Sequence, residues 1–226
     1  MSEVIRQFEF NVAAVNEPHI ACVLLLDTSG SMAGASIKSL NHGLRGFKDQ
    51  SMLDDLARKR IDVAIVTFNS TAQVIQSFEP LPEMSTPALE ASGQTAMGAG
   101  LNLAMDLINR RKALYKEVGT PYFRPWIFMI TDGEPTDEYE TAAARLKDLE
   151  ERKKLMCWAI GVPGYNPAAL KQITDRVIEL NDVNFVSMFE WLSNSMVAVS
   201  NSNVGDKVRF SDLPDNARVI PDSWAD

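Results

Sequence analysis

Long hydrophobic runs are missing from this sequence. A membrane-spanning helix needs about 18 or more consecutive apolar residues, and no stretch of the 226-residue chain approaches that length. The opening residues, MSEVIRQFEF, also lack the basic start and apolar segment of a signal peptide. We therefore expect a cytoplasmic protein with no membrane contact.

Cysteine and histidine are scarce, with two residues of each. Cys22 and Cys157 lie in apolar runs that are typical of buried strands, so we interpret them as small core residues rather than as a disulfide or a catalytic pair. His19 and His42 stand apart from the motifs described below and are expected to be structural. Redox chemistry is therefore not expected.

Positive charge is also in short supply. The chain has 22 Lys and Arg residues against 30 Asp and Glu residues, which gives a formal net charge of −8. Binding to a nucleic-acid backbone demands a basic face. We therefore expect no nucleic acid among the partners, whereas the oligomeric state stays open.

Apolar segments of strand length alternate with amphipathic helical segments along the chain. This alternation predicts an α/β fold, a doubly wound and mostly parallel six-stranded sheet with helices on both faces. One antiparallel strand comes from the hairpin at 60–78. The expected strands are 20–27, 60–69, 72–78, 125–132, 155–162 and 176–180. One expected helix has Ile37, Leu40, Leu44 and Phe47 on its apolar face. The other expected helices span 96–118, 138–154, 166–175 and 185–201.

We divide the chain into three parts. Residues 1–18 form an N-terminal segment in which the alternation of Phe8, Phe10 and Val12 allows a short strand. Residues 19–202 form the main domain. Residues 203–226 lose the helical and strand periodicity, and we expect a C-terminal extended tail there.

Two aspartates follow buried strands directly. Asp27 comes after VLLL and opens the motif DTSGSM, and Asp132 ends the run MITD. In an open, doubly wound sheet the functional crevice lies at the carboxyl ends of the strands. Because a buried carboxylate is costly without a partner, and neither motif contains Lys or Arg, we expect a metal cation to pair with both.

Hydroxyl groups complete the candidate site. Ser29 and Ser31 alternate with Asp27, and Thr95 lies in the loop ASGQTAMG before a predicted helix. Hard oxygens without His or Cys suit Mg²⁺ or Mn²⁺. Two carboxylates at most balance the charge of such an ion, so it stays electrophilic and would accept a carboxylate from another molecule.

The order Asp27-Thr28-Ser29-Gly30-Ser31, Thr95, Asp132 resembles the metal-ion-dependent adhesion site (MIDAS) of von Willebrand factor A (VWA) domains. Within that superfamily the chain is similar to bacterial tellurite-resistance proteins of the TerY type, from Cys22 to Val208. The segments that carry this similarity are LLLDTSGSM, RPWIFMITDGEPTDEY and FEWLSNSMVAVSNSNVGDKV.

The resemblance implies a VWA domain at 19–202 that binds a divalent metal and protein partners without catalysis. By the same resemblance, Ser29, Ser31 and Thr95 would contact the metal directly, and Asp27 and Asp132 would hold it largely through water. A partner's Asp or Glu would complete the coordination. A role in bacterial stress response, or beside a kinase and a phosphatase, is implied only by the family.

A rim around this site is predicted at Thr28, Gly133, Glu134 and Asp137, where charge would select partners; a solvated loop is the alternative. A second exposed motif, GTPYFRPW, contains Tyr122, Phe123 and Arg124, which are residue types enriched at binding hot spots. It precedes a strand at the end far from the metal, so packing against the sheet is the preferred interpretation.

Other interpretations stay open. Asp27 and Thr95 could merely cap helices, and Asp132-Gly133 is a common turn dipeptide. A Mg²⁺-dependent phosphotransferase or phosphatase with Asp27 as nucleophile would need an acid two positions on, where Ser29 stands. No GxxxxGK[ST] loop is present to cradle nucleotide phosphates. A metal-independent structural scaffold is the third alternative, and we predict that the protein is not an enzyme.

Overall fold

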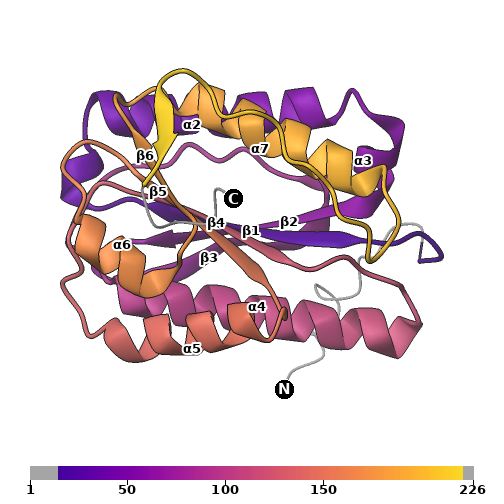
Figure 1. Cartoon of the computed structure of the whole chain (residues 1–226). Coiled ribbons are helices and arrows are strands. Elements are labelled where there is room, and N and C mark those ends of the chain that lie inside the picture. The colour runs from indigo at the N-terminus through magenta and orange to yellow at the C-terminus, as the bar shows by residue number, and fades with distance from the viewer. Residues whose placement is uncertain (1–14, 221–226) are drawn as a thin grey trace.

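One seven-stranded sheet lies at the centre of the computed structural model, which describes residues 15–220 (Figure 1). The strand order is β3-β2-β1-β4-β5-β6-β7. All neighbours run parallel except the two edge strands, β3 and β7, which are antiparallel to β2 and β6. The strands are β1 (Ile20–Asp27), β2 (Ile61–Phe68), β3 (Ala72–Pro80), β4 (Trp126–Thr131), β5 (Met156–Gly161), β6 (Val177–Leu180) and β7 (Ala217–Val219).

Helices cover both faces of the sheet (Figure 1). On one face lie α2 (Ala35–Ser51) and α7 (Phe185–Ser200), and on the other lie α4 (Met97–Val118) and α5 (Glu140–Glu151). Shorter elements are α3 (Asp55–Arg60) beside α7, α6 (Pro167–Ile173) beside α5, and the 3₁₀ turns η1 (Gly30–Met32) and η2 (Leu81–Glu83).

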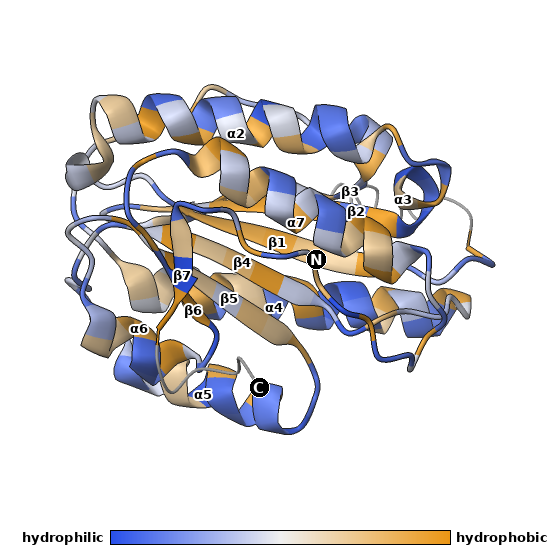
Figure 2. Cartoon of the chain, turned by 45° about the horizontal axis from the view of Figure 1, so that its top comes forward, coloured by the Kyte–Doolittle hydropathy of each residue, from blue (hydrophilic) through white to orange (hydrophobic). Residues whose placement is uncertain are grey.

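The central strands are buried on both faces. Every residue of β1, β2 and β4 is buried, and Figure 2 shows the strands as hydrophobic bands between the helical layers. Successive side chains of β1 point to opposite faces: Leu24 packs in the core beneath α2 and α7, and Leu25 in the core above α4. This two-sided burial explains why these strands read as continuous apolar runs.

The predicted α/β class and doubly wound architecture are confirmed, but the sheet has seven strands where six were predicted. The additional strand, β7, lies in the segment expected to be an extended tail, and it pairs with β6 through Ile178 and Val219. A three-residue strand is too short to produce a periodic pattern. The possible strand at Phe8–Val12 lies outside the described residues.

Both cysteines are buried free thiols, as predicted. Within residues 15–220, none of the helices combines the length and apolar character that crossing a bilayer requires.

Candidate functional site

The candidate site lies where β1 and β4 meet. These strands are neighbours in the centre of the sheet, yet the chain goes from β1 to β2 on one side and continues to β4 on the other. Such a change of direction leaves a crevice at the carboxyl ends of the two strands. Asp27 is the last residue of β1, and Asp132 follows the last residue of β4.

A chain of hydrogen bonds joins three of the predicted site residues. The Ser31 hydroxyl donates to Asp132 Oδ1 at 2.6 Å, and Ser29 Oγ lies 3.0 Å from Ser31 Oγ. Since Ser31 gives its proton to Asp132, Ser29 must donate to Ser31. The lone pairs of Ser29 Oγ are thereby left available to another group.

Asp27 is fully buried and is held from two sides. Its Oδ1 accepts the backbone N–H of Ser29 at 2.8 Å, and its Oδ2 accepts the hydroxyl of Thr131 at 2.5 Å. The Thr131 oxygen in turn accepts the N–H of Gly133 at 3.2 Å. The sequence analysis did not include Thr131 in the site. Its position directly before Asp132, at the end of a buried strand, could have indicated that its hydroxyl lies near the two aspartates.

Thr95, in the loop before α4, lies beside Gly133 and Asp27. Its N–H donates to the Thr136 hydroxyl at 3.0 Å, and its carbonyl accepts the Thr136 N–H at 2.9 Å. A methyl group added to Gly133 would lie 3.0 Å from Thr95 Oγ1 and 3.6 Å from Asp27 Oδ2. The fold therefore brings all five predicted oxygen-bearing side chains to one place, with Gly133 small enough to let two of them approach.

The four predicted rim residues have different surroundings. Glu134 is exposed, with its carboxylate 3.4 Å from Asn166 Nδ2, and Gly133 is partly exposed. Thr28 is buried, and both its N–H and its hydroxyl donate to the Phe68 carbonyl. Asp137 accepts the N–H groups of Gly98 and Ala99 in the first turn of α4. Its carboxylate therefore stabilises a helix N-terminus.

The electrostatics of the site favour a cation. Burial raises the pKa of Asp27 above its ordinary value, although hydrogen bonds from Ser29 and Thr131 oppose the change. Burial likewise raises the pKa of Asp132, against the Ser31 hydrogen bond. Within the described part of the chain no Lys, Arg or His forms an ion pair with either carboxylate. Burying two carboxylates without a positive partner costs free energy, and a bound cation would reduce that cost.

The donor set fits a hard divalent cation. Residues 15–220 contain no group of three or more His, Cys, Asp or Glu side chains suited to a metal. The present set differs from such groups because three of its five side chains bear hydroxyls. Carboxylate and hydroxyl oxygens suit Mg²⁺ or Mn²⁺, and they supply no imidazole or thiolate of the kind that dominates zinc sites.

A second buried carboxylate lies at the other end of the sheet. Asp62, near the start of β2, has its Oδ2 within 2.9 Å of His19 Nδ1 and 2.8 Å of an Arg111 Nη2 atom. The Tyr115 hydroxyl donates to the same oxygen. His19 thus belongs to a buried structural cluster, whereas His42 is exposed on α2.

The GTPYFRPW motif divides between packing and exposure. Phe123 is buried, and the Tyr122 ring stacks on Tyr115 with centroids 5.5 Å apart. Arg124 stays partly exposed. Packing against the sheet therefore accounts for the two aromatic residues of the motif and leaves the arginine at the surface.

Comparisons with known proteins show the family and the fold. The family model of the von Willebrand factor type A domain matches residues 22–191. The chain therefore belongs to the von Willebrand factor type A domain family. A comparison with curated proteins found no match.

Solved structures support the fold. A von Willebrand factor type A protein from Catenulispora acidiphila matches with a TM-score of 0.60 and 20% identity, over 84% of this chain and 48% of that one. Proximal thread matrix protein 1 from the mussel byssus matches with a TM-score of 0.59 and 16% identity, over 92% and 50%. The same mussel protein, described with a zinc-occupied MIDAS motif, gives 0.53 and 19%, over 83% and 46%. The chain thus spans about half the length of these relatives.

Proposed function

We propose that this chain is a metal-dependent protein-interaction module. Ser29, Ser31 and Thr95 would contact a divalent cation, and Asp27 and Asp132 would hold it largely through water. When bound, the cation supplies an electrophilic position for the Asp or Glu carboxylate of a partner protein. The single observation that carries the proposal is the convergence of two buried carboxylates with three hydroxyl side chains at the β1–β4 crevice. Neither carboxylate forms an ion pair with a Lys, Arg or His within residues 15–220.

The chain's own residues would orient the site in defined ways. The hydrogen bonds from Ser29 to Ser31 and from Ser31 to Asp132 direct the hydroxyl protons away from the lone pairs that would face the cation. Thr131 fixes one oxygen of Asp27, and the Ser29 N–H fixes the other. These contacts support a site whose geometry exists before the metal arrives, which lowers the cost of binding.

The comparisons support a divalent cation without identifying it. One relative is described with zinc in its MIDAS motif, whereas the oxygen donors of this chain favour Mg²⁺ or Mn²⁺. A cytoplasmic location and a role in tellurite resistance, stress response or a kinase- and phosphatase-linked system stay predictions from the family resemblance.

The test is isothermal titration of Mg²⁺, Mn²⁺ and Zn²⁺ into EDTA-stripped protein, repeated with Asp27→Ala and Ser29→Ala. We expect saturable one-site binding that both variants abolish, and tighter binding when acetate or a Glu-containing peptide is added. Asp49→Ala, which removes an exposed aspartate at the far end of α2, is the matched control and should bind normally. Binding that persists in both site variants, or no effect of carboxylate, would contradict the proposal.

The alternative of a phosphotransferase receives less support. Asp27 is fully buried and both its oxygens accept hydrogen bonds, which makes it a poor nucleophile. The position of a general acid is occupied by Ser29, whose hydroxyl is too weak an acid for that role at neutral pH. We propose that the protein is not an enzyme; Mg²⁺-dependent hydrolysis of a phosphate monoester that Asp27→Ala abolishes would overturn this.

A metal-independent scaffold is the remaining alternative. It predicts that EDTA changes neither stability nor partner binding. The titration above, combined with a pull-down in EDTA and in Mg²⁺, distinguishes it from the metal-dependent module.

A further inference from the structure

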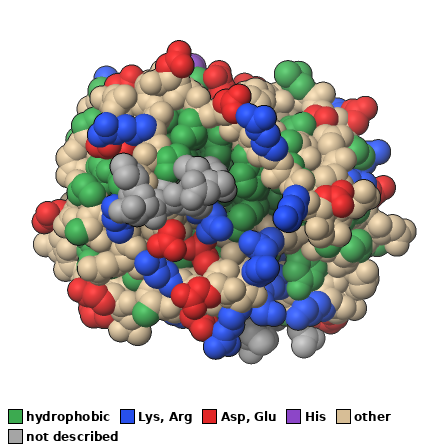
Figure 3. Space-filling model, viewed as in Figure 1, with side chains coloured by type: hydrophobic (Ala, Val, Ile, Leu, Met, Phe, Trp, Pro, Cys, Tyr) green, Lys and Arg blue, Asp and Glu red, His purple; other side chains and the backbone are tan. Residues whose placement is uncertain are grey.

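A pocket lined by both apolar and polar side chains lies at the amino end of the sheet, at the opposite end from Asp27 and Asp132. The first residues of β4 and β5 and the chain that follows α7 line a half-open pocket of about 250 Å³. Figure 3 shows hydrophobic side chains gathered in a hollow on the face crossed by that chain, with Lys and Arg side chains beside it. The apolar lining includes Phe123, Trp126, Met156, Val199, Val208 and Phe210.

The size and walls of the pocket suit one aromatic side chain. The Phe210 ring meets Trp126, which also lines the pocket, and Trp158, which does not; both contacts are edge to face with centroids 5.3 Å apart. Aromatic walls such as Phe210 and Trp126 favour another aromatic ring. A cavity of about 150 Å³ is enough for benzene. Pockets for independent small molecules usually start near 300 Å³. The cavity therefore suits a side chain that a polypeptide carries in.

Among the polar residues that line the pocket, Arg124 is the cationic one, and its neighbours Asp206 and Ser202 form hydrogen bonds elsewhere. Asp206 accepts the Asn203 N–H at 2.9 Å, and the Ser202 hydroxyl donates to the Val199 carbonyl at 2.8 Å. Arg124 makes no hydrogen bond or ion pair with any residue that the structure describes. Burial lowers its pKa, the nearby guanidinium of Arg176 lowers it further, and the charge of Glu150 opposes both.

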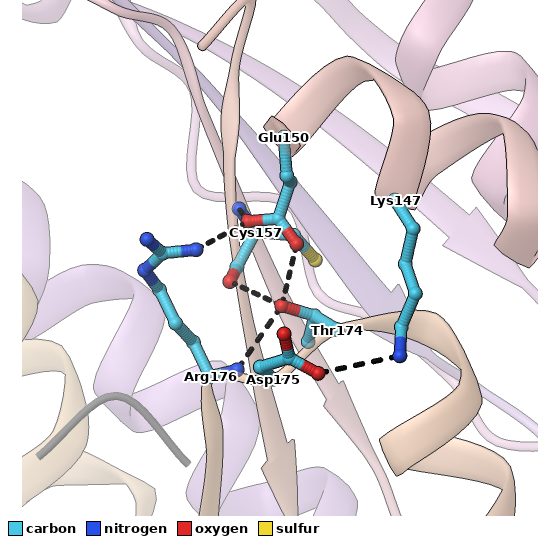
Figure 4. Close-up of polar contacts among 6 residues, drawn as sticks. All are labelled: Lys147, Glu150, Cys157, Thr174, Asp175 and Arg176. Atoms are coloured by element: carbon cyan, nitrogen blue, oxygen red, sulfur yellow. Dashed lines mark hydrogen bonds and ion pairs between the residues drawn. The ribbon is translucent and has the colours of Figure 1, made fainter. Parts of the chain in front are cut away.

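Arg176 does not share this condition, because Glu150 neutralises it. Figure 4 shows the network in which Glu150 Oε1 accepts from Arg176 at 2.7 Å and from the Cys157 N–H at 2.8 Å. The Thr174 hydroxyl donates to the other Glu150 oxygen at 2.7 Å. Glu150 attracts Arg124 through its charge, but its oxygens accept hydrogen bonds from Arg176, Cys157 and Thr174. An incoming carboxylate would give Arg124 a direct charge-assisted pair, which it lacks among the described residues.

Exposed apolar side chains extend the surface beyond the pocket. Val204, on the pocket wall, is 52% exposed, and Leu53 is 85% exposed. The two lie at the same end of α7, because Asp54, beside Leu53, accepts from the Asn201 amide at 3.2 Å. Large exposed apolar residues around a pocket are typical of protein contact sites.

We propose that this pocket docks a partner polypeptide through one aromatic side chain, with Arg124 pairing with an acidic residue next to it in the partner. This contact is independent of the metal site and lies at the other end of the molecule. A chain with both contacts would connect two proteins.

The test uses the full chain and a fluorescein-labelled peptide, Asp-Glu-Trp-Glu-Asp, followed by fluorescence anisotropy. We expect saturable binding that EDTA and Asp27→Ala leave unchanged. Arg124→Ala should weaken binding about tenfold or more through loss of a charge-assisted pair, and Val204→Asp should weaken it similarly by placing a like charge on the wall. The matched controls on the opposite face, Arg110→Ala and Val118→Asp, should bind as the unmodified chain does.

Two results would overturn the proposal. The first is no saturable binding, or equal binding by Arg124→Ala and the unmodified chain. The second concerns residues 221–226, PDSWAD, which themselves combine a tryptophan with two aspartates. If Trp224→Ala in the full chain strengthens peptide binding markedly, the chain's own end competes for the pocket and a separate partner is not its main occupant. A peptide with Trp replaced by Ala checks that the aromatic side chain is required.

Discussion

Asp27 at the carboxyl end of β1 and Asp62 near the amino end of β2 are both fully buried, yet their surroundings differ. Asp62 contacts Arg111 and His19 and accepts the Tyr115 hydroxyl. Burial alone would raise the pKa of Asp62, but the His19 hydrogen bond and the Arg111 charge outweigh it and lower the pKa. Asp27 has hydroxyl and N–H partners but no cation among residues 15–220, and burial raises its pKa.

The comparison separates a carboxylate that the fold itself neutralises from one that we propose to be functional. At the amino end, the protein supplies the positive charge itself, so the buried Asp62 charge is compensated as soon as the chain folds. At the carboxyl end, the negative charge is oriented by hydrogen bonds but not neutralised. On the function proposed above, a ligand would complete the neutralisation, and for these oxygen donors that ligand would be a divalent cation.

The largest expected effect concerns stability at the amino end. Asp62→Asn removes the carboxylate that pairs with buried Arg111, so we expect the free energy of unfolding to fall by about 3–5 kcal/mol. Because the pKa of Asp62 is lowered, its stabilising contribution is present above the ordinary value of 3.8 and is lost as the pH falls through the lowered pKa. Urea unfolding at neutral and acidic pH measures both effects, and the two proteins should converge in acid.

Asp106→Asn provides the control for this prediction. Asp106 pairs with Arg145 at 2.7 Å on the surface, where both side chains are more than a third exposed. Its loss should cost only about 0–1 kcal/mol. If Asp62→Asn costs no more than Asp106→Asn, the buried cluster does not stabilise the amino end and the contrast with Asp27 fails.

The opposite pattern is expected at Asp27. Asp27→Asn removes a buried charge that has no cation partner, so the stability of the metal-free protein should change by less than about 1 kcal/mol. With Mg²⁺ at 100 times its dissociation constant, the unmodified chain should gain about 2.7 kcal/mol and the variant nothing. Thermal unfolding with EDTA and with Mg²⁺ measures both quantities. An equal Mg²⁺-dependent gain in the two proteins would refute the assignment.

The central strands and the approach of Asp27 to Asp132 could be predicted from the sequence for a common reason. Continuous apolar runs such as IACVLLL are long and specific, and the parallel sheet brings their carboxyl ends together, so Asp27 and Asp132 had to meet. Among the short elements, α6 and β6 were predicted, but α3 and β7 were not. The six-residue helix α3 depends on Asp54, whose side chain accepts the Ala57 N–H, and β7 depends on pairing with β6.

Side-chain contacts between distant loops were also beyond the sequence. Nothing in the order of residues reveals that Thr131 donates to Asp27, or that Asp137 reaches back 39 positions to Gly98. The pocket at Arg124 is assembled from three separate segments in the same way. Such contacts depend on the precise approach of packed elements, which hydrophobic patterns do not encode.

A Thr131 variant tests whether the hydrogen bond to Asp27 at the carboxyl end of the sheet is needed for metal binding. Thr131→Val keeps the shape of the side chain but removes the hydroxyl that holds Asp27 and accepts from Gly133. Loss of such a supporting contact typically lowers metal affinity about 10- to 100-fold, and we expect this in a Mg²⁺ titration. Thr71→Val, in the exposed β2–β3 turn, should leave the affinity unchanged. Unaltered Mg²⁺ affinity in Thr131→Val would mean that Asp27 needs no such orientation.

Asp137 gives the smallest effect and tests where the site ends. Its carboxylate accepts two N–H groups at the start of α4, so Asp137→Asn should cost about 0.5–1 kcal/mol of stability through a weaker helix cap. Mg²⁺ affinity and the effect of added acetate should stay within a factor of about two, since the lost charge stabilises the helix.

Exposed Glu134 provides the contrast to Asp137. Glu134→Gln should leave stability unchanged and strengthen binding of an acidic peptide to the metal-loaded protein, because it removes a repelling charge. If Asp137→Asn alters peptide binding more than Glu134→Gln does, Asp137 belongs to the partner-binding rim and its contact with α4 is secondary.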